Sequence, residues 1–250
     1  MQLGAQFYTL REFCKDLNGL SESLKKVADI GYKTVQISGV CGYDAEWMKE
    51  ELRKNGLTCP ITHPSPDRIK NDTLKVIEEH KTFGCPYIGL GYYNIKNLGT
   101  DSFIEEFREA AKVIKENGLA LSYHNHADEF IKVNGKRMMD TFVEAFSPEE
   151  LKFTIDTYWV QAGGADPVWW LEYLKGRTPC IHLKDMNYQD KATRPMAVIG
   201  EGNMNFPAIL KTAIDCGVDY ALVEQDDCNG ENPFDCLKRS YEYLKAQGLE

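Results

Sequence analysis

The sequence predicts an α/β protein that forms a single (β/α)₈ barrel domain over residues 1–250. Short apolar runs rich in β-branched and aromatic residues alternate eight times with longer amphipathic segments, which is typical of parallel strands joined by helical crossovers. A length of 250 residues suits one closed barrel. An open doubly wound sheet would need a glycine-rich turn after its first strand, and the segment FYTLREFC has no such turn.

Each predicted strand is a short segment with polar residues at its end. In chain order the strands are LGAQFYTL (3–10), KTVQIS (33–38), TCPITH (58–63), PYIGLGY (86–92), LALSYH (119–124), LKFTID (151–156), PCIHLKD (179–185) and YALVEQD (220–226). The predicted helices between them include 19–31, 44–56, 72–84, 101–118 and 206–217. Several helices begin near Ser, Asp or Thr and end in Gly, the usual N-terminal and C-terminal capping residues.

The composition of the chain disfavours some kinds of binding partner. The chain has 29 Lys and Arg against 38 Asp and Glu, and a net charge of −9 disfavours nucleic acid. We find neither a secretory signal nor an apolar run long enough to span a bilayer. The eight cysteines are scattered without a C-x-x-C pair, which indicates reduced thiols. We therefore expect a cytoplasmic protein that binds a small molecule, with no nucleic acid or membrane as partner; a homo-oligomer is left open.

The chemistry is expected at the carboxyl ends of the strands, where barrels of this kind carry their active sites. Four of the five histidines lie at strand ends, namely His63, His124, His126 and His182, whereas His80 lies in a helical pattern. Side chains along a strand alternate between its two faces. This alternation points Asp156, His124, His126, His182, Lys184 and Glu224 into the barrel. We expect them to converge at its mouth.

His124, Asp156, His182 and Glu224 come from four consecutive predicted strands and form a candidate metal site. One His or Asp at a strand end is more often structural, and Asp156 alone could cap a helix, but four matching strand ends favour a site. Mixed nitrogen and oxygen ligands suit Mn²⁺, Co²⁺, Zn²⁺ or Fe²⁺ better than Ca²⁺. Such a metal would polarise a substrate oxygen and stabilise an enediolate. Trp159 is a candidate wall for a sugar ring.

Several segments also follow the order of motifs in a known family: GAQFYTLRE (4–12), YHNHADEF (123–130), FTIDTYWVQAGGADP (153–167), IHLKD (181–185), IGEGNMNFPAIL (199–210) and LVEQD (222–226). The chain resembles the xylose isomerase-like TIM barrel superfamily, which includes the sugar phosphate isomerase/epimerase family. The resemblance covers the whole chain. It implies a divalent metal, often Mn²⁺, and proton transfer next to a sugar or cyclitol carbonyl.

The resemblance implies that Asp156, His182 and Glu224 are metal ligands. The strand-five ligand of the epimerases is a glutamate, and here the inward position holds His124, with His126 as the alternative. The epimerases use two carboxylates as acid and base, and this chain keeps Glu224 of the two. The candidates for the second base are Lys184, His126, Glu129 and Glu201.

The expected function is a divalent-metal-dependent isomerase or epimerase of a sugar, keto-sugar or cyclitol that works by proton abstraction next to a carbonyl. The expected catalytic residues are Glu224, Lys184 and Glu129, and the expected substrate contacts are Tyr8, His63, His126, Trp159 and Glu201. The alternative is a dehydratase or lyase on an inosose or 3-keto-sugar with the same metal site, since the YH-x-H pattern resembles that branch. A DNA endonuclease is disfavoured by the acidic charge, and a non-catalytic sugar-binding barrel by the intact ligand set. No dedicated phosphate loop is evident, and the sequence leaves the sugar itself open.

Overall fold

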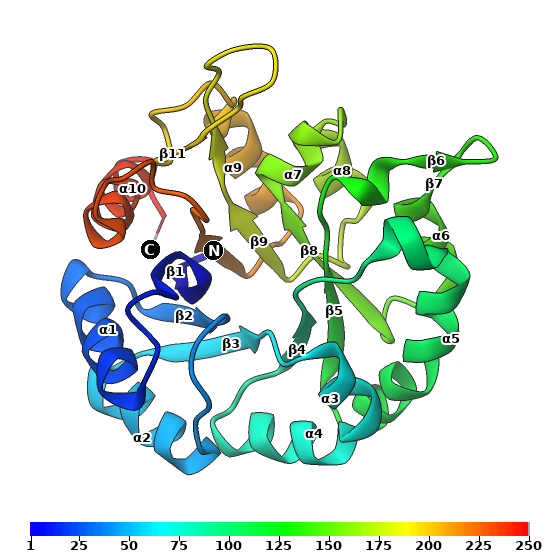
Figure 1. The fold of residues 1–250 in the computed structure, drawn as a ribbon, viewed down its shortest axis with the longest axis horizontal. Helices are drawn as coiled ribbons and strands as arrows, with labels where there is room; N and C mark the ends of the chain where they lie inside the picture. The colour runs from blue at the N-terminus through cyan, green and yellow to red at the C-terminus, as the bar shows by residue number, and fades with distance from the viewer. Residues whose placement is uncertain (250) are drawn as a thin grey trace.

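The computed structural model describes residues 1–249, which form a closed barrel of eight parallel strands inside a ring of helices (Figure 1). Around the barrel lie β1 (Gln2–Gln6), β2 (Thr34–Ile37), β3 (Thr58–Thr62), β4 (Tyr87–Leu90), β5 (Ala120–His124), β8 (Leu151–Asp156), β9 (Cys180–Leu183) and β12 (Tyr220–Val223). The pairing of β1 with β12 closes the sheet. The predicted (β/α)₈ barrel is confirmed, and every predicted strand segment overlaps one of these strands. The first prediction, 3–10, is too long, because β1 ends at Gln6 and residues Phe7–Leu10 form a 3₁₀ turn.

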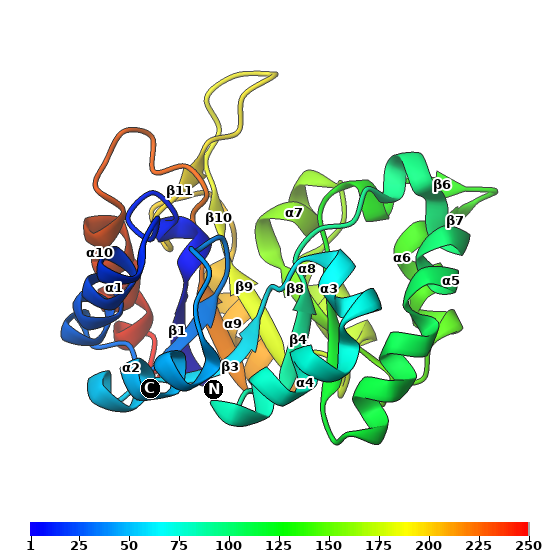
Figure 2. The same cartoon turned by 60° about the horizontal axis from the view of Figure 1, so that its bottom comes forward.

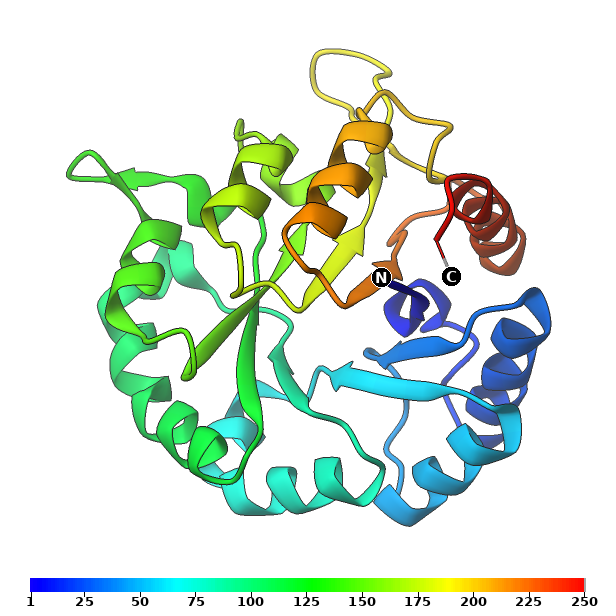
Figure 3. The same cartoon turned by 180° about the vertical axis from the view of Figure 1, so that it is seen from behind.

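The helices cover the outside of the barrel, as the view from behind also shows (Figure 3). They are α1 (Leu17–Ile30), α2 (Ala45–Asn55), α3 (Pro66–Asn71), α4 (Thr73–Thr82), α5 (Ile95–Glu116), α6 (Met138–Ala145), α7 (Thr157–Ala162), α8 (Pro167–Tyr173), α9 (Phe206–Asp215) and α10 (Pro233–Ala246), with 3₁₀ turns η1 (Phe7–Leu10) and η2 (Asp128–Phe130). None of the helices in residues 1–249 combines the length and hydropathy that crossing a membrane requires.

Two small hairpins extend from the barrel: β6 (Lys132–Val133) pairs with β7 (Lys136–Arg137), and β10 (Asp185–Met186) pairs with β11 (Met196–Ala197). Figure 2 shows the loop between β10 and β11, in yellow, rising well above the end of the barrel to which the strand arrows point. The β10–β11 hairpin directly follows β9, so it belongs to the end of the barrel where the strand-end side chains gather.

The interior of the barrel changes from apolar to polar along the strands. Ile61, Cys180 and Leu222 form a separate buried apolar cluster inside the barrel. His182 lies two residues after Cys180, and Glu224 lies two residues after Leu222, so each polar residue shares the inward face of the apolar one before it. The register pairs Asp156 with His182, so the polar side chains of neighbouring strands stand at one level. The strand pleat therefore places an apolar layer inside the barrel and a polar layer above it, toward the carboxyl ends of the strands.

Gly89 on β4 and Gly91 just after it make room for a histidine ring. A Cβ atom added at Gly89 or Gly91 would come within 2.6 Å of the ring of His63. A glycine inside a strand often marks such a close approach. The inward side of β4 is therefore filled by His63 from the end of β3.

His80 on α4 predicts a measurable pH dependence of stability. It is buried, with Nε2 2.8 Å from Thr62 Oγ1 and Nδ1 2.6 Å from the Val76 carbonyl oxygen. Burial lowers the pKa of His80 from 6.5 to about 4. Between these values the unfolded chain binds more protons than the folded one, so stability falls as the pH drops, by about 3 kcal/mol in all.

In His80→Gln this loss should be absent, because glutamine does not titrate. Urea unfolding of both proteins at pH 7 and pH 4.5 should show that the wild type loses about 2–3 kcal/mol more than the variant over that interval. An identical pH dependence in the two proteins would contradict the assignment.

Candidate active site and metal centre

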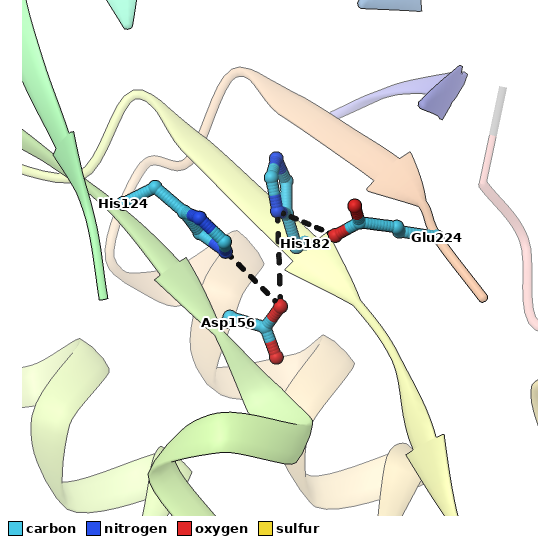
Figure 4. Close-up of side chains that lie close together, drawn as sticks. All are labelled: His124, Asp156, His182 and Glu224. Carbon is cyan, nitrogen blue, oxygen red and sulfur yellow. Dashed lines mark hydrogen bonds and ion pairs between the residues drawn. The ribbon is translucent and has the colours of Figure 1, made fainter. Parts of the chain in front are cut away.

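Four side chains of ligand type meet at the carboxyl end of the barrel (Figure 4). His124 ends β5, Asp156 ends β8, His182 lies on β9 and Glu224 follows β12. All four are buried, and one ligand atom from each lies within 4.8 Å of the other three. The structure thus brings together the four residues that the sequence predicted as metal ligands.

The facing atoms of this cluster lie close together. His124 Nε2 is 3.2 Å from Asp156 Oδ2. His182 Nδ1 is 3.0 Å from Glu224 Oε2 and 3.8 Å from Asp156 Oδ2. Two ring nitrogens and two carboxylate oxygens therefore surround one small volume.

In each imidazole the nitrogen that points away from the cluster, here called the outer nitrogen, contacts a protein oxygen. His124 Nδ1 lies 3.0 Å from the Gly91 carbonyl oxygen, which can only accept a hydrogen bond. His182 Nε2 lies 2.6 Å from Gln36 Oε1, also an acceptor. Each outer nitrogen therefore donates a hydrogen bond. The inner nitrogens also face acceptors, the carboxylate oxygens of Asp156 and Glu224, so a cation in the cluster would take the place of the inner proton, as in ligating histidines.

Each carboxylate uses one oxygen for the protein and turns the other inward. Asp156 Oδ1 accepts from the backbone N–H of Trp159 at 3.0 Å in the first turn of α7. Glu224 Oε1 accepts from Gln6 Nε2 at 2.6 Å. The helix-capping role of Asp156 and its expected ligand role are therefore compatible, because they use different oxygens.

The donor set fits a divalent cation. Among the described residues, His182 Nδ1 and Glu224 Oε2 are buried atoms that form no hydrogen bond, and Glu224 Oε2 is balanced in charge by Lys184 at 2.9 Å. A buried unpaired polar group costs about 1–3 kcal/mol. A cation between the four side chains would satisfy both atoms. Two imidazoles and two carboxylates suit Mn²⁺, Fe²⁺, Co²⁺ or Zn²⁺.

Lys184 lies against this cluster as a fixed positive charge. Its buried Nζ is 3.0 Å from Asp156 Oδ2, 2.9 Å from Glu224 Oε2 and 3.0 Å from Asp226 Oδ1. Burial disfavours the ammonium, but the three carboxylates outweigh it and raise the pKa of Lys184. These three neighbours hold Lys184 as a cation, which disfavours it among the predicted candidates for the second base.

The same ammonium acts on its carboxylate partners. Burial works to raise the pKa of Asp156 and of Glu224, but the charge of Lys184 outweighs it and holds both pKa values well below their usual range. Both carboxylates are therefore ionised, as metal ligands must be.

Asp226 also belongs to the site, although the sequence analysis assigns it no role. It lines the same cavity as Glu224, two residues earlier in the chain. Burial and the charge of Glu224 raise the pKa of Asp226 to about 6. Its spacing of two from Glu224 was the available signal, because that spacing puts both residues on one face while the chain stays extended.

A cavity of about 520 Å³ opens above the cluster. Tyr8, His126 and Trp159 lie on its wall, as expected for substrate contacts. The ring centroids of His126 and Trp159 are 5.4 Å apart, and the ring centroid of Tyr92 is 5.5 Å from that of His126. The wall thus combines aromatic faces with ring nitrogens.

Two predicted site residues, His63 and Glu129, have protein groups as partners in place of a substrate. His63 lines the cavity, but its nitrogens contact Gln36 Nε2 at 2.7 Å and Ser38 Oγ at 3.0 Å, so neither is free for a substrate hydroxyl. Glu129 is buried beneath the wall, where it accepts from the Tyr123 hydroxyl at 2.6 Å and the His126 N–H at 2.8 Å. Glu129 therefore positions the backbone of His126.

Glu201 lies outside the cavity. It is exposed and pairs with Arg239 at 2.9 Å. The prediction of Glu201 as a base or substrate contact is wrong, because this loop carries its side chain to the surface.

Gln36 predicts a test of how the ligands are oriented. Its amide accepts from His182 and donates to His63 Nε2, so it selects which nitrogen of His182 faces the cluster. In Gln36→Leu the affinity for Mn²⁺ should fall about 10–100-fold, the usual effect of losing such a partner. Titration calorimetry measures this. Gln36→Glu keeps an acceptor for His182 and should retain most of the affinity, whereas equal affinity in wild type and Gln36→Leu would contradict the role.

Known proteins are similar to this chain in sequence or in fold. An inosose dehydratase from Geobacillus kaustophilus (strain HTA426) is 22% identical over 265 residues, which cover 88% of this chain and 85% of that protein. A sugar phosphate isomerase/epimerase from Parabacteroides distasonis ATCC 8503 has a TM-score of 0.81 at 24% identity, covering 98% of this chain and 93% of the other. An L-ribulose 3-epimerase has a TM-score of 0.77 at 13% identity, covering 99% and 94%. Because the xylose isomerase-like TIM barrel family matches residues 24–247, the chain belongs to that family.

Proposed function

We propose that the chain is a divalent-metal-dependent isomerase or epimerase of a keto-sugar or cyclitol that removes a proton next to the carbonyl. The observation that carries this proposal is the buried cluster of four facing ligand atoms, of which His124 and Glu224 line the cavity. A volume of about 520 Å³ is in the usual range for small-molecule sites. Relatives that are an isomerase/epimerase and an epimerase by name support the reaction class.

His124, Asp156, His182 and Glu224 would hold the metal. A bound divalent ion supplies positive charge that polarises a carbonyl and lowers the cost of an enediolate. We assign proton removal to Glu224, which is ionised, lines the cavity and is held in place by Gln6. The Lys184 ammonium, held between Asp156, Glu224 and Asp226, places a fixed positive charge beside the cavity in which a substrate oxygen gains negative charge.

Epimerisation needs a second group that returns the proton on the other face of the substrate. Asp226 and His126 both line the cavity, can carry a proton and are not assigned as ligands. Either could replace the second carboxylate of the epimerases, which is absent from strand five.

Dehydration is the second candidate. Lys184 and Asp226 lie 3.0 Å apart beside Glu224, so a proton donor for a departing hydroxyl is near the proposed base. The similarity to an inosose dehydratase over 88% of the chain also favours it. Both reactions begin with the same proton removal, and they differ in whether a water leaves.

Glu224→Gln should separate the base from the ligand. Glutamine keeps an oxygen that can bind metal but has no basic oxygen for the proton, so solvent deuterium exchange into a keto-sugar should fall about 10²–10⁴-fold. NMR follows the exchange, and metal analysis shows whether the ion is retained. Undiminished exchange in Glu224→Gln would reject Glu224 as the base, and Asp226→Asn is the matched variant for the neighbouring carboxylate.

Product mass separates the two candidate functions. Metal-loaded protein incubated in D₂O with a panel of keto-sugars and inososes should give products of unchanged composition apart from deuterium. A product that has lost one water would show the dehydratase instead. Chelator-treated protein is the control and should give neither. Activity that persists without metal would contradict both forms of the proposal.

A further inference from the structure

We propose that the cavity takes an uncharged polyol ketone and excludes the phosphate ester of the same sugar. Carboxylates of the chain occupy two groups that could otherwise bind a phosphate: the backbone N–H groups of the loop that directly follows the cavity residue Lys184, and the Lys184 cation itself. This inference rests on the proposed function and names its substrate class. Four observations carry it.

The first observation is the carboxylate of Asp185, which follows the seventh barrel strand. Its Oδ1 accepts from the N–H groups of Met186 at 2.7 Å and Met204 at 3.3 Å, and its Oδ2 from those of Gly200 at 3.0 Å and Gly202 at 3.1 Å. In barrels of this kind the loops after strands seven and eight frequently bind phosphate. In this chain an internal anion occupies the N–H groups of the loop after strand seven.

The space around Asp185 is also closed. Asp185 is buried, and a Cβ atom added at Gly202 would come within 2.4 Å of its Oδ1. The glycine thus brings the loop backbone directly onto the carboxylate. A phosphate cannot share these N–H groups without displacing Asp185.

The second observation concerns cations. Of the residues that line the cavity, all in the described part of the chain, Lys184 is the single lysine or arginine, and three carboxylates surround it. Arg11 lies beside the cavity, stacked 4.3 Å from the Tyr8 ring centroid, and donates to the carbonyl oxygens of Tyr8 and Asp226. Both side chains already have partners, so neither is left to pair with a phosphate.

The third observation is the charge balance. Asp156, Glu224 and Asp226 bring three potential negative charges, and Lys184 brings one positive charge. A divalent ion would bring the total to zero. A neutral substrate leaves this balance intact, whereas a phosphate dianion would add uncompensated negative charge in a partly buried site.

The fourth observation is the polar atoms that are free. Within residues 1–249, Trp159 Nε1 and His126 Nδ1 are buried without a hydrogen-bond partner, and both residues line the cavity. An indole N–H donates, and an imidazole offers a donor or an acceptor, so both suit hydroxyl groups. The aromatic faces of Trp159, His126 and Tyr92 suit the C–H side of a sugar or cyclitol.

Matched pairs of substrates test the inference on the wild-type protein. Mn²⁺-loaded enzyme is given D-fructose with D-fructose 6-phosphate, D-ribulose with D-ribulose 5-phosphate, and an inosose with its phosphate, and deuterium exchange is measured for each. The free sugar of any active pair should exchange at least about tenfold faster. Faster exchange of the phosphate would overturn this inference and leave the proposed function standing. Absence of exchange in every pair would contradict the proposed function, and this inference with it.

Asp185 gives a test that does not depend on activity. Asp185→Ala opens the N–H groups, so its melting temperature should fall and should be partly restored by sulfate relative to chloride at equal ionic strength. Asp190→Ala is the matched control, because Asp190 also accepts from two backbone N–H groups but is exposed on the β10–β11 loop. Sulfate that stabilises the wild type as much as Asp185→Ala would overturn the inference, and this wild-type measurement stands even if the variant does not fold.

Trp159→Phe tests the hydroxyl contacts. It removes the N–H donor and keeps an aromatic ring, so the Kd for the active free sugar should rise about 2–10-fold. Trp169→Phe is the control, because Trp169 is 42% exposed and lies outside the cavity. Equal affinity in Trp159→Phe and the wild type would overturn the role of Trp159 as a hydroxyl contact.

Discussion

The structure depends on keeping two ionised carboxylates buried at the carboxyl end of the barrel. Asp156 Oδ2 and Glu224 Oε2 face the same small volume, and removing such charges from water costs several kcal/mol each unless they are paired. Lys184 supplies one positive charge to both oxygens. The two imidazoles complete the set of ligand atoms. A divalent cation bound among them would compensate the negative charge that Lys184 leaves unbalanced.

The surrounding residues fix the orientation of each ligand. Gly91 and Gln36 determine which nitrogen of His124 and His182 faces inward, and Gln6 does the same for the oxygens of Glu224. These contacts come from the first half of the barrel, on or just after β1, β2 and β4, whereas the ligands come from β5 onward. Both halves of the barrel therefore contribute to one centre. The strands position the ligands, and the buried hydrogen bonds around them keep the geometry rigid.

Much of this could be predicted from the sequence, because strand alternation is a local rule. The pleat fixes the inward side of β8, β9 and β12, so Asp156, His182 and Glu224 follow from parity alone. The rule ends where the strands end, so it gave no direction for Glu201, whose loop carries the side chain to the surface. It also says nothing of partners from distant segments: Gln36 and Ser38 occupy His63, while Tyr123 and the His126 backbone occupy Glu129.

The central claim is that the four facing atoms bind one divalent cation. Anomalous diffraction from crystals grown with Mn²⁺ tests it most directly. The account predicts a single strong peak in the barrel mouth, at about 2.0–2.3 Å from His124 Nε2, Asp156 Oδ2, His182 Nδ1 and Glu224 Oε2. A peak coordinated by other residues, or no peak between these four atoms in protein saturated with Mn²⁺, would contradict it.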